Sequence, residues 1–270
     1  MINNKISRSQ LYLYVSERIQ QYNHLFRNVQ YLQEVFNDSA RLIEPFEERL
    51  SYKDNIILKT DFDYIFQNCL RDVKTSSFKE YLLLEYRKKY KEEVLERSDT
   101  RINSIDVGTF LINTIAKYQN KMIDSNYIRE ANNYLLPRTQ KNKKTFLSYA
   151  FDDKGLSFAL FLYFLDRNGF LYVDWMWNGR IKDTVRLKEL ISNEIQTSDQ
   201  LLFLRTTASE LNSKGNRSIR QWCSWEIGNF YCKNKEQKYV LAFYDSKINN
   251  ALLDTFKVFY DVDNGTIIKY

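Results

Sequence analysis

The sequence is poor in the residues that carry most metal binding and much of enzyme chemistry. It has one histidine, three cysteines, two prolines and seven glycines in 270 residues. Cys69, Cys223 and Cys232 are odd in number and lack CxxC spacing, which argues against a disulfide framework and a zinc site. We therefore predict no metal, and we expect Cys223 and Cys232 to be buried and unreactive. His24, beside an apolar helix face, is more often structural than a ligand or base in such a place.

Long apolar runs are also missing. The longest hydrophobic stretches, such as that from Phe158 to Leu165, are too short to span a bilayer, and the N-terminus has no apolar run of signal-peptide length. Together with the cysteine usage, this predicts a cytoplasmic protein without a membrane partner.

Charge is mixed rather than clustered. Forty basic and 34 acidic side chains are interleaved and give a net charge of +6, which is more typical of a solvated surface than of a nucleic-acid interface. We thus expect no direct nucleic-acid partner. The run of Lys88, Lys89, Lys91, Glu92 and Glu93 is likewise predicted to be a solvated helix face.

Glycine is unevenly distributed along the chain. Only Gly108 falls in the first 140 residues, where apolar residues recur every three or four positions, so residues 1–140 are predicted to form an all-α domain. The expected helices run over residues 11–26, 76–96 (capped by Ser76 or Ser77), 107–118 and 125–136. Pro137 and the lysines after it predict a linker to a second domain, residues 141–270.

The second domain alternates short apolar runs with helical segments. Strands are expected at 145–151, 170–174, 200–206 and 238–244, with helices at 155–168 and 183–196 and a third carrying Trp222 and Glu226. A polar loop is expected at 209–217. This order predicts an α/β fold with a parallel sheet between helices, with sites at the carboxyl ends of the strands.

Three motifs occur in a characteristic order. Phe146-Leu147-Ser148-Tyr149 is followed by Asp152 and Asp153; Asp174 precedes a loop with Gly179 and Ile181; and Trp222-Cys223-Ser224-Trp225-Glu226-Ile227 follows. The segment resembles the TIR (Toll/interleukin-1 receptor) domain, which implies a flavodoxin-like fold. It departs from the family where WMWNGR lacks the proline associated with receptor scaffolds, and where Arg220 replaces a frequent serine.

The resemblance implies an enzyme that cleaves the nicotinamide–ribose bond of NAD at Glu226. Nicotinamide leaves without needing a proton, so one carboxylate that stabilises the ribose oxocarbenium ion can suffice in a chain with a single histidine. Helical spacing places Cys223, Ile227 and Phe230 against the sheet and leaves Trp222 and Glu226 on an adjoining face. The residues expected to bind the substrate are Trp222, Ser148, Tyr149, Asp174 and, for phosphate, Arg180.

The implied role is that of an NAD+ nucleosidase or ADP-ribosyl cyclase in bacterial antiphage defence, similar to the Thoeris type. NAD would be a substrate, with no cofactor; self-association through both domains and a downstream effector that responds to the nucleotide product are expected. One alternative is a non-catalytic TIR scaffold, in which Trp222, Glu226 and the strand-end residues only pack or cap loops. A flavodoxin-like or receiver-like regulatory domain is a third interpretation, but the tryptophan–glutamate helix and the lack of a phosphorylation or flavin loop argue against it.

Overall fold

The computed structural model describes residues 5–21, 29–50, 56–90, 101–123, 143–178, 181, 183–213, 216–234, 236–243 and 253–269. Several predicted features lie outside these ranges: His24, the helix at 125–136, most of the linker, and Arg180 in the loop after Asp174. No helix among the described residues is long and apolar enough to cross a membrane.

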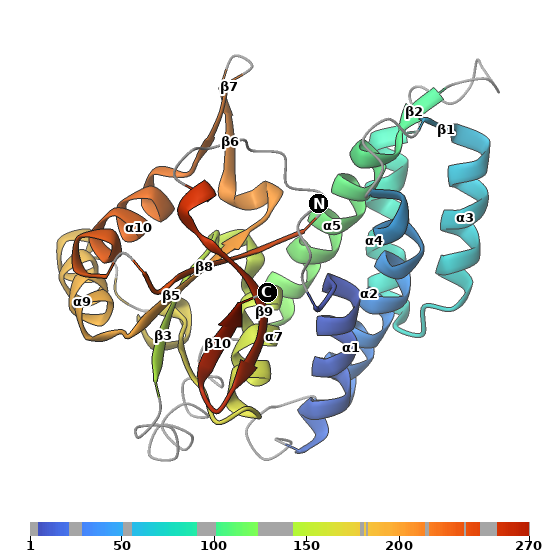
Figure 1. The fold of residues 1–270 in the computed structure, drawn as a ribbon. Helices are drawn as coiled ribbons and strands as arrows, with labels where there is room; N and C mark the ends of the chain where they lie inside the picture. The colour runs from blue at the N-terminus through green and yellow to red at the C-terminus, as the bar shows by residue number, and fades with distance from the viewer. Residues whose placement is uncertain are drawn as a thin grey trace.

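A mostly parallel sheet forms the centre of the molecule (Figure 1). Its strands are β3 (Lys144–Ser148), β4 (Phe170–Tyr172), β5 (Gln200–Arg205), β8 (Lys238–Ala242), β9 (Lys257–Asp263) and β10 (Thr266–Lys269). They follow the order β10-β9-β8-β5-β3-β4, and only β10 is antiparallel to its neighbour. The five parallel strands, numbered in chain order, are arranged 2-1-3-4-5, a doubly wound order. The predicted α/β class is confirmed.

Helices cover both faces of this sheet. They are α7 (Lys154–Leu165), α8 (Asp174–Asn178), α9 (Thr184–Thr197) and α10 (Gln221–Lys233), with the 3-10 turns η2 (Phe151–Asp153), η3 (Thr207–Ser209) and η4 (Leu253–Thr255). In β5, Leu201 and Phe203 pack with α9 and α10, whereas Leu202 and Leu204 pack with α7. Because successive strand residues face opposite ways, an uninterrupted apolar strand fits a sheet that is buried on both sides.

Local sequence explains several element ends. Asp183 caps α9 by accepting hydrogen bonds from the N–H groups of Val185 and Arg186. After α7, Asn168 adopts a φ of 52°, and the Gly169 N–H then donates to the carbonyl of Phe164, so the predicted Asn-Gly stop is confirmed. By contrast, Arg220 gives α10 no side-chain cap.

The predicted strand pattern was incomplete. The expected polar loop at 209–217 is in fact largely an antiparallel hairpin of β6 (Glu210–Ser213) and β7 (Asn216–Ile219). Strands β9 and β10 were not predicted. They are joined by a tight turn at Asn264 and Gly265, both with positive φ, which fixes their antiparallel pairing.

The N-terminal part, here called the helical region, comprises the described residues from 5 to 123. It contains α1 (Arg8–Arg18), α2 (Val29–Leu50), β1 (Ile56–Leu58), α3 (Lys59–Arg71), α4 (Ser76–Tyr90), β2 (Arg101–Asn103) and α5 (Ser104–Met122). The all-α prediction was wrong in one respect, because β1 and β2 pair antiparallel. Strands of three residues are too short to show a period of two in the sequence.

The end of α1 and the start of α4 also differ from the predicted positions. Helix α1 ends at Arg18 and continues as a 3-10 turn to residue 21. Helix α4 begins at Ser76, so neither Ser76 nor Ser77 is its cap. Asp38 of α2 accepts from the N–H groups of Lys74 and Thr75, which precede α4, and so fixes the backbone that leads into this helix. A contact between residues 37 positions apart leaves no local pattern in the sequence.

The helical region and the sheet share one hydrophobic core. Helices α1, α2 and α5 lie on the side of the sheet that α7 covers, and Val15 and Ile115 belong to the same buried cluster as Phe158 and Phe164. The boundary predicted near residue 140 therefore separates two sequence patterns that pack together.

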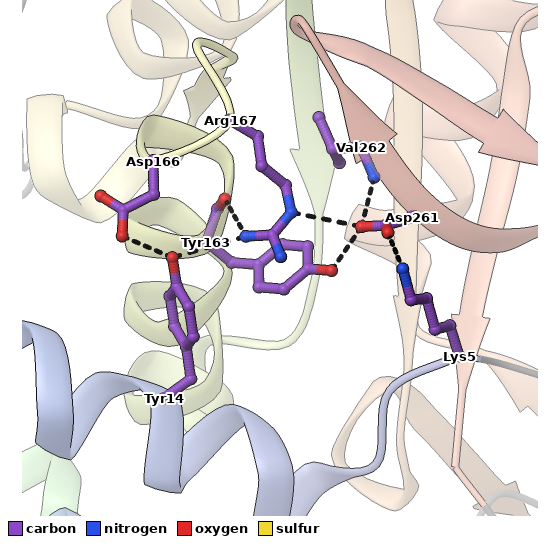
Figure 2. Close-up of polar contacts among 7 residues, drawn as sticks. All are labelled: Lys5, Tyr14, Tyr163, Asp166, Arg167, Asp261 and Val262. Atoms are coloured by element: carbon purple, nitrogen blue, oxygen red, sulfur yellow. Dashed lines mark hydrogen bonds and ion pairs between the residues drawn. The ribbon is translucent and has the colours of Figure 1, made fainter.

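Hydrogen bonds at the C-terminal end of α7 join this helix to α1 and to β9 (Figure 2). Tyr14 of α1 donates to Asp166, and Arg167 donates to Asp261 of β9 over 3.2 Å. Tyr163 and Lys5 also donate to Asp261. The start of the chain is thus tied to both α7 and the C-terminal hairpin.

Candidate functional site

Four of the predicted site residues meet at the carboxyl end of the sheet. Ser148 is the last residue of β3, Tyr149 follows it, Asp174 begins α8 just after β4, and Glu226 lies on α10. Ser148 Oγ donates to Glu226 Oε2 over 2.6 Å, and the Tyr149 hydroxyl donates to Asp174 Oδ1. Parallel strands place their carboxyl ends at one edge, which is why residues so far apart in sequence converge.

Helix α10 sets the position of Glu226. Cys223, Ile227 and Phe230 are buried against the sheet, as their spacing predicts. The Cys223 thiol donates to the carbonyl of Tyr149 over 3.4 Å, which anchors the start of α10 to the end of β3. Glu226 is nevertheless only 3% exposed, so it lies deeper than a residue on an adjoining face would be expected to lie.

Trp222 accompanies Glu226, as predicted. Its side chain is half-buried and lies close enough to the Glu226 carboxyl group to lower the pKa of that group. The ring centroids of Trp222 and Trp225 lie 5.3 Å apart, at a tilted angle. Part of the Trp222 side chain is exposed to solvent.

Burial and a neighbouring acid raise the pKa of Glu226. Burial raises the pKa of Glu226 well above its usual value, the charge of Asp174 raises it further, and the hydrogen bonds from Ser148 and Trp222 only partly oppose this. Burial also raises the pKa of Asp174, against hydrogen bonds from Tyr149 and from the N–H of Trp175. Two buried acids in this relation disfavour double ionisation, so the pair holds a proton more readily than isolated acids do.

Tyr149 and Lys154, at the same site, also have shifted pKa values. Burial and the charge of Asp174 raise the pKa of Tyr149 well above its usual value, which keeps its hydroxyl protonated and able to donate. Burial lowers the pKa of Lys154, and Asp174 opposes that shift. The Lys154 ammonium lies 4.2 Å from the ring centroid of Phe151 and 5.6 Å from that of Trp175.

Sequence reasoning missed the supporting residues. Lys154 brings positive charge to Asp174, and Trp175 Nε1 donates to Ser157 Oγ over 2.9 Å, which ties α8 to α7. Asp153 accepts from Thr206 Oγ1 over 2.6 Å, linking the turn after β3 to the end of β5. Lys154 directly follows the two aspartates of the first motif, and this position was the one signal that could have identified it.

Cys223 is buried, as predicted, whereas the prediction that Cys232 is buried was wrong. Cys223 is buried, and burial followed by the charge of Glu226 raises its pKa to about 12. Cys232 is exposed because nine residues along a helix correspond to roughly two and a half turns, which places it on the opposite side of α10. No group of three or more possible metal ligands occurs within the described ranges.

This arrangement can stabilise a cation and hold hydroxyl groups. A carboxylate in a desolvated site interacts strongly with positive charge that develops beside it, and the Tyr149 oxygen, whose proton is donated to Asp174, can accept a hydrogen bond from a ligand hydroxyl. With Glu226 only 3% exposed, a ligand reaches it after the neighbouring side chains move apart.

Comparisons with protein-family models, with curated proteins and with solved structures gave no match.

Proposed function

We propose that this protein is a TIR-type NAD+ nucleosidase or ADP-ribosyl cyclase in which Glu226 is the catalytic residue. One observation carries the proposal: Glu226 is a buried carboxyl group at the carboxyl end of a 2-1-3-4-5 parallel sheet, hydrogen-bonded by Ser148 and adjacent to Asp174. Groups with strongly perturbed pKa values are concentrated at functional sites, although structural networks perturb them as well.

In the proposed reaction the bond between ribose C1′ and the nicotinamide nitrogen breaks. Nicotinamide takes both bonding electrons and leaves as a neutral molecule, and positive charge appears on the ribose. The Glu226 carboxylate stabilises that charge at close range, in a site with little water. In hydrolysis, water then adds to C1′ and releases one proton to solvent. In cyclisation, a nucleophilic atom of the same nucleotide adds to C1′ instead, and the nucleotide releases one proton to solvent.

The raised pKa of Glu226 is compatible with this role. A substrate that carries a positive nicotinamide ring brings a cation next to the acid pair, and an adjacent cation favours the ionised form of a carboxyl group. Substrate binding would thereby convert a readily protonated Glu226 into the carboxylate that the reaction uses. Ser148 and Trp222 would keep that carboxylate oriented.

The wider role that we propose is bacterial antiphage defence in the cytoplasm. The chain would self-associate, and its nucleotide product would act on a downstream effector or deplete NAD.

The alternative function is a non-catalytic TIR module. The hydrogen bond that Ser148 donates to the buried Glu226 carboxyl group is the observation in its favour, because a purely structural site would hold the group in the same way.

Product analysis separates these functions. Purified protein, dilute and concentrated, is incubated with NAD, and the nucleotides are identified by mass; a hydrolysed product is heavier than a cyclic one by one water. Nicotinamide release that falls sharply in Ser148→Ala supports the role of the Ser148–Glu226 contact. No turnover at any concentration would favour the non-catalytic module.

A further inference from the structure

A hollow of about 350 Å³ lies between α4 and α5 in the helical region, far from Glu226 in the chain and on other elements. The residues that line it are Glu85, Lys88 and Lys89 from α4, and Thr109, Phe110, Asn113, Thr114 and Lys117 from α5. The α5 residues follow Thr109 at one, four, five and eight positions, so they form one face of that helix. Part of the charge run that was predicted to be only a solvated face therefore borders a concave surface.

The hollow is positively charged. Three lysines line it against one acidic residue, Glu85, which leaves an excess of two positive charges. Glu85 pairs with Lys88 at 2.6 Å. No carboxylate of the described residues forms an ion pair with Lys117, which is exposed. At least one ammonium group is thus available to an anion from solution.

Aromatic and neutral polar groups accompany the lysines. The Lys89 ammonium lies 4.9 Å from the ring centroid of Phe110, and the Phe110 carbonyl accepts a hydrogen bond from Thr114 Oγ1 over 2.7 Å. Phe110 is half-buried, so one part of its ring is held by the core and another borders the hollow. Thr109 and Asn113 add a hydroxyl and an amide on the same face.

We propose that this hollow binds a nucleotide carrying a polyphosphate chain. The lysines would neutralise the phosphates, Asn113 and Thr109 would hydrogen-bond the sugar or base edge, and Phe110 would contact the face of the base. The volume lies at the lower end of the range of small-molecule sites, which suits one nucleotide better than a dinucleotide. The site does not depend on the proposed NAD cleavage and would stand if that reaction were absent.

Binding to the full-length chain tests the proposal, with ATP and inorganic tripolyphosphate as probes in equilibrium dialysis at low salt. Combined Lys88→Gln, Lys89→Gln and Lys117→Gln should weaken ATP binding by well over tenfold, at about fivefold for each charge removed. Lys121→Gln is the matched control, since Lys121 is exposed one turn further along α5 and lies outside the hollow. It should leave binding nearly unchanged.

Glu85→Gln gives a test that misfolding cannot imitate. Glu85 is the one carboxylate among the described residues that line the hollow, and removing it should tighten ATP binding several-fold, because Lys88 loses its competing partner. Phe110→Leu should weaken ATP but not tripolyphosphate. Absence of saturable ATP binding, an unchanged affinity in the triple lysine variant, or weaker binding in Glu85→Gln would overturn the site. Equal affinities for ATP and tripolyphosphate would overturn its assignment to a nucleotide.

Discussion

Gly155 marks a close approach between the helical region and the sheet. It is the second residue of α7, and a Cβ at this position would lie 2.1 Å from Gln119 Oε1 and 2.8 Å from Gln119 Cδ. Gln119 of α5 is fully buried, and its Nε2 donates to Ser39 Oγ of α2 over 3.1 Å. The amide therefore cannot move aside without giving up that hydrogen bond or displacing α5.

Three effects determine how much a Gly155→Ala substitution changes the free energy of unfolding. Alanine should gain about 0.5–1 kcal/mol from its higher helix propensity. Overpacking in a dense core costs about 1–3 kcal/mol, and loss of the Gln119–Ser39 hydrogen bond costs about 1 kcal/mol more. We therefore expect the free energy of unfolding to fall by about 1–3 kcal/mol, or about 2–10 °C in Tm for a chain of this length.

Gly228→Ala provides the matched control. Gly228 lies in α10, it is exposed, and a Cβ there would meet nothing within 4 Å. This variant should be more stable than wild type by about 0.5–1 kcal/mol. Thermal unfolding followed by circular dichroism measures both changes. A Gly155→Ala protein as stable as Gly228→Ala would refute the packing of α5 against α7 described above.

Three further predictions concern titration and reactivity. Because the fold raises the pKa of Glu226, the native state holds its proton more readily than the unfolded chain, and wild type loses stability as pH rises above the usual value of 4.5. The Tm of Glu226→Gln minus the Tm of wild type should therefore increase from pH 5 to pH 8. A difference that stays constant over this range would contradict the prediction. Burial opposes ionisation of Asp261, but hydrogen bonds from Lys5 and Tyr163 outweigh this effect and lower the pKa of Asp261 to about 2. Asp261→Asn should therefore destabilise the protein at neutral pH, and the loss of stability should shrink as the pH falls from 3.8 toward 2. Cys232 should react with a thiol reagent in the native protein and Cys223 only after unfolding; mass analysis of labelled peptides would reveal the reverse order.

Sequence patterns predicted the α/β class because the responsible signals are local. The unbroken apolar run of β5 indicates a strand buried on both faces. Asp183 marks the start of α9 through its side-chain cap, and Asn168 marks the stop after α7 through its positive φ. The convergence of Ser148, Tyr149 and Asp174 follows from the parallel direction of their strands.

Other features depend on contacts that no local pattern encodes. Ser148 and Glu226 are 78 residues apart, and helical spacing assigns Glu226 to a face without fixing how deeply it lies. The shared core is a similar case, because an apolar helix face does not specify which partner covers it. Lys154 was missed because its role depends on where Asp174 lies in space.

The proposed catalytic role of Glu226 can be measured as nicotinamide release from NAD by three proteins at equal and high concentration: wild type, Glu226→Gln and Glu189→Gln. Glu189 lies on the exposed face of α9 and controls for the loss of one negative charge. We expect release by wild type and Glu189→Gln, and a loss of at least about a hundredfold in Glu226→Gln, the scale of removing one main electrostatic group from an active site. Equal release by all three proteins would show that Glu226 is not the catalytic residue.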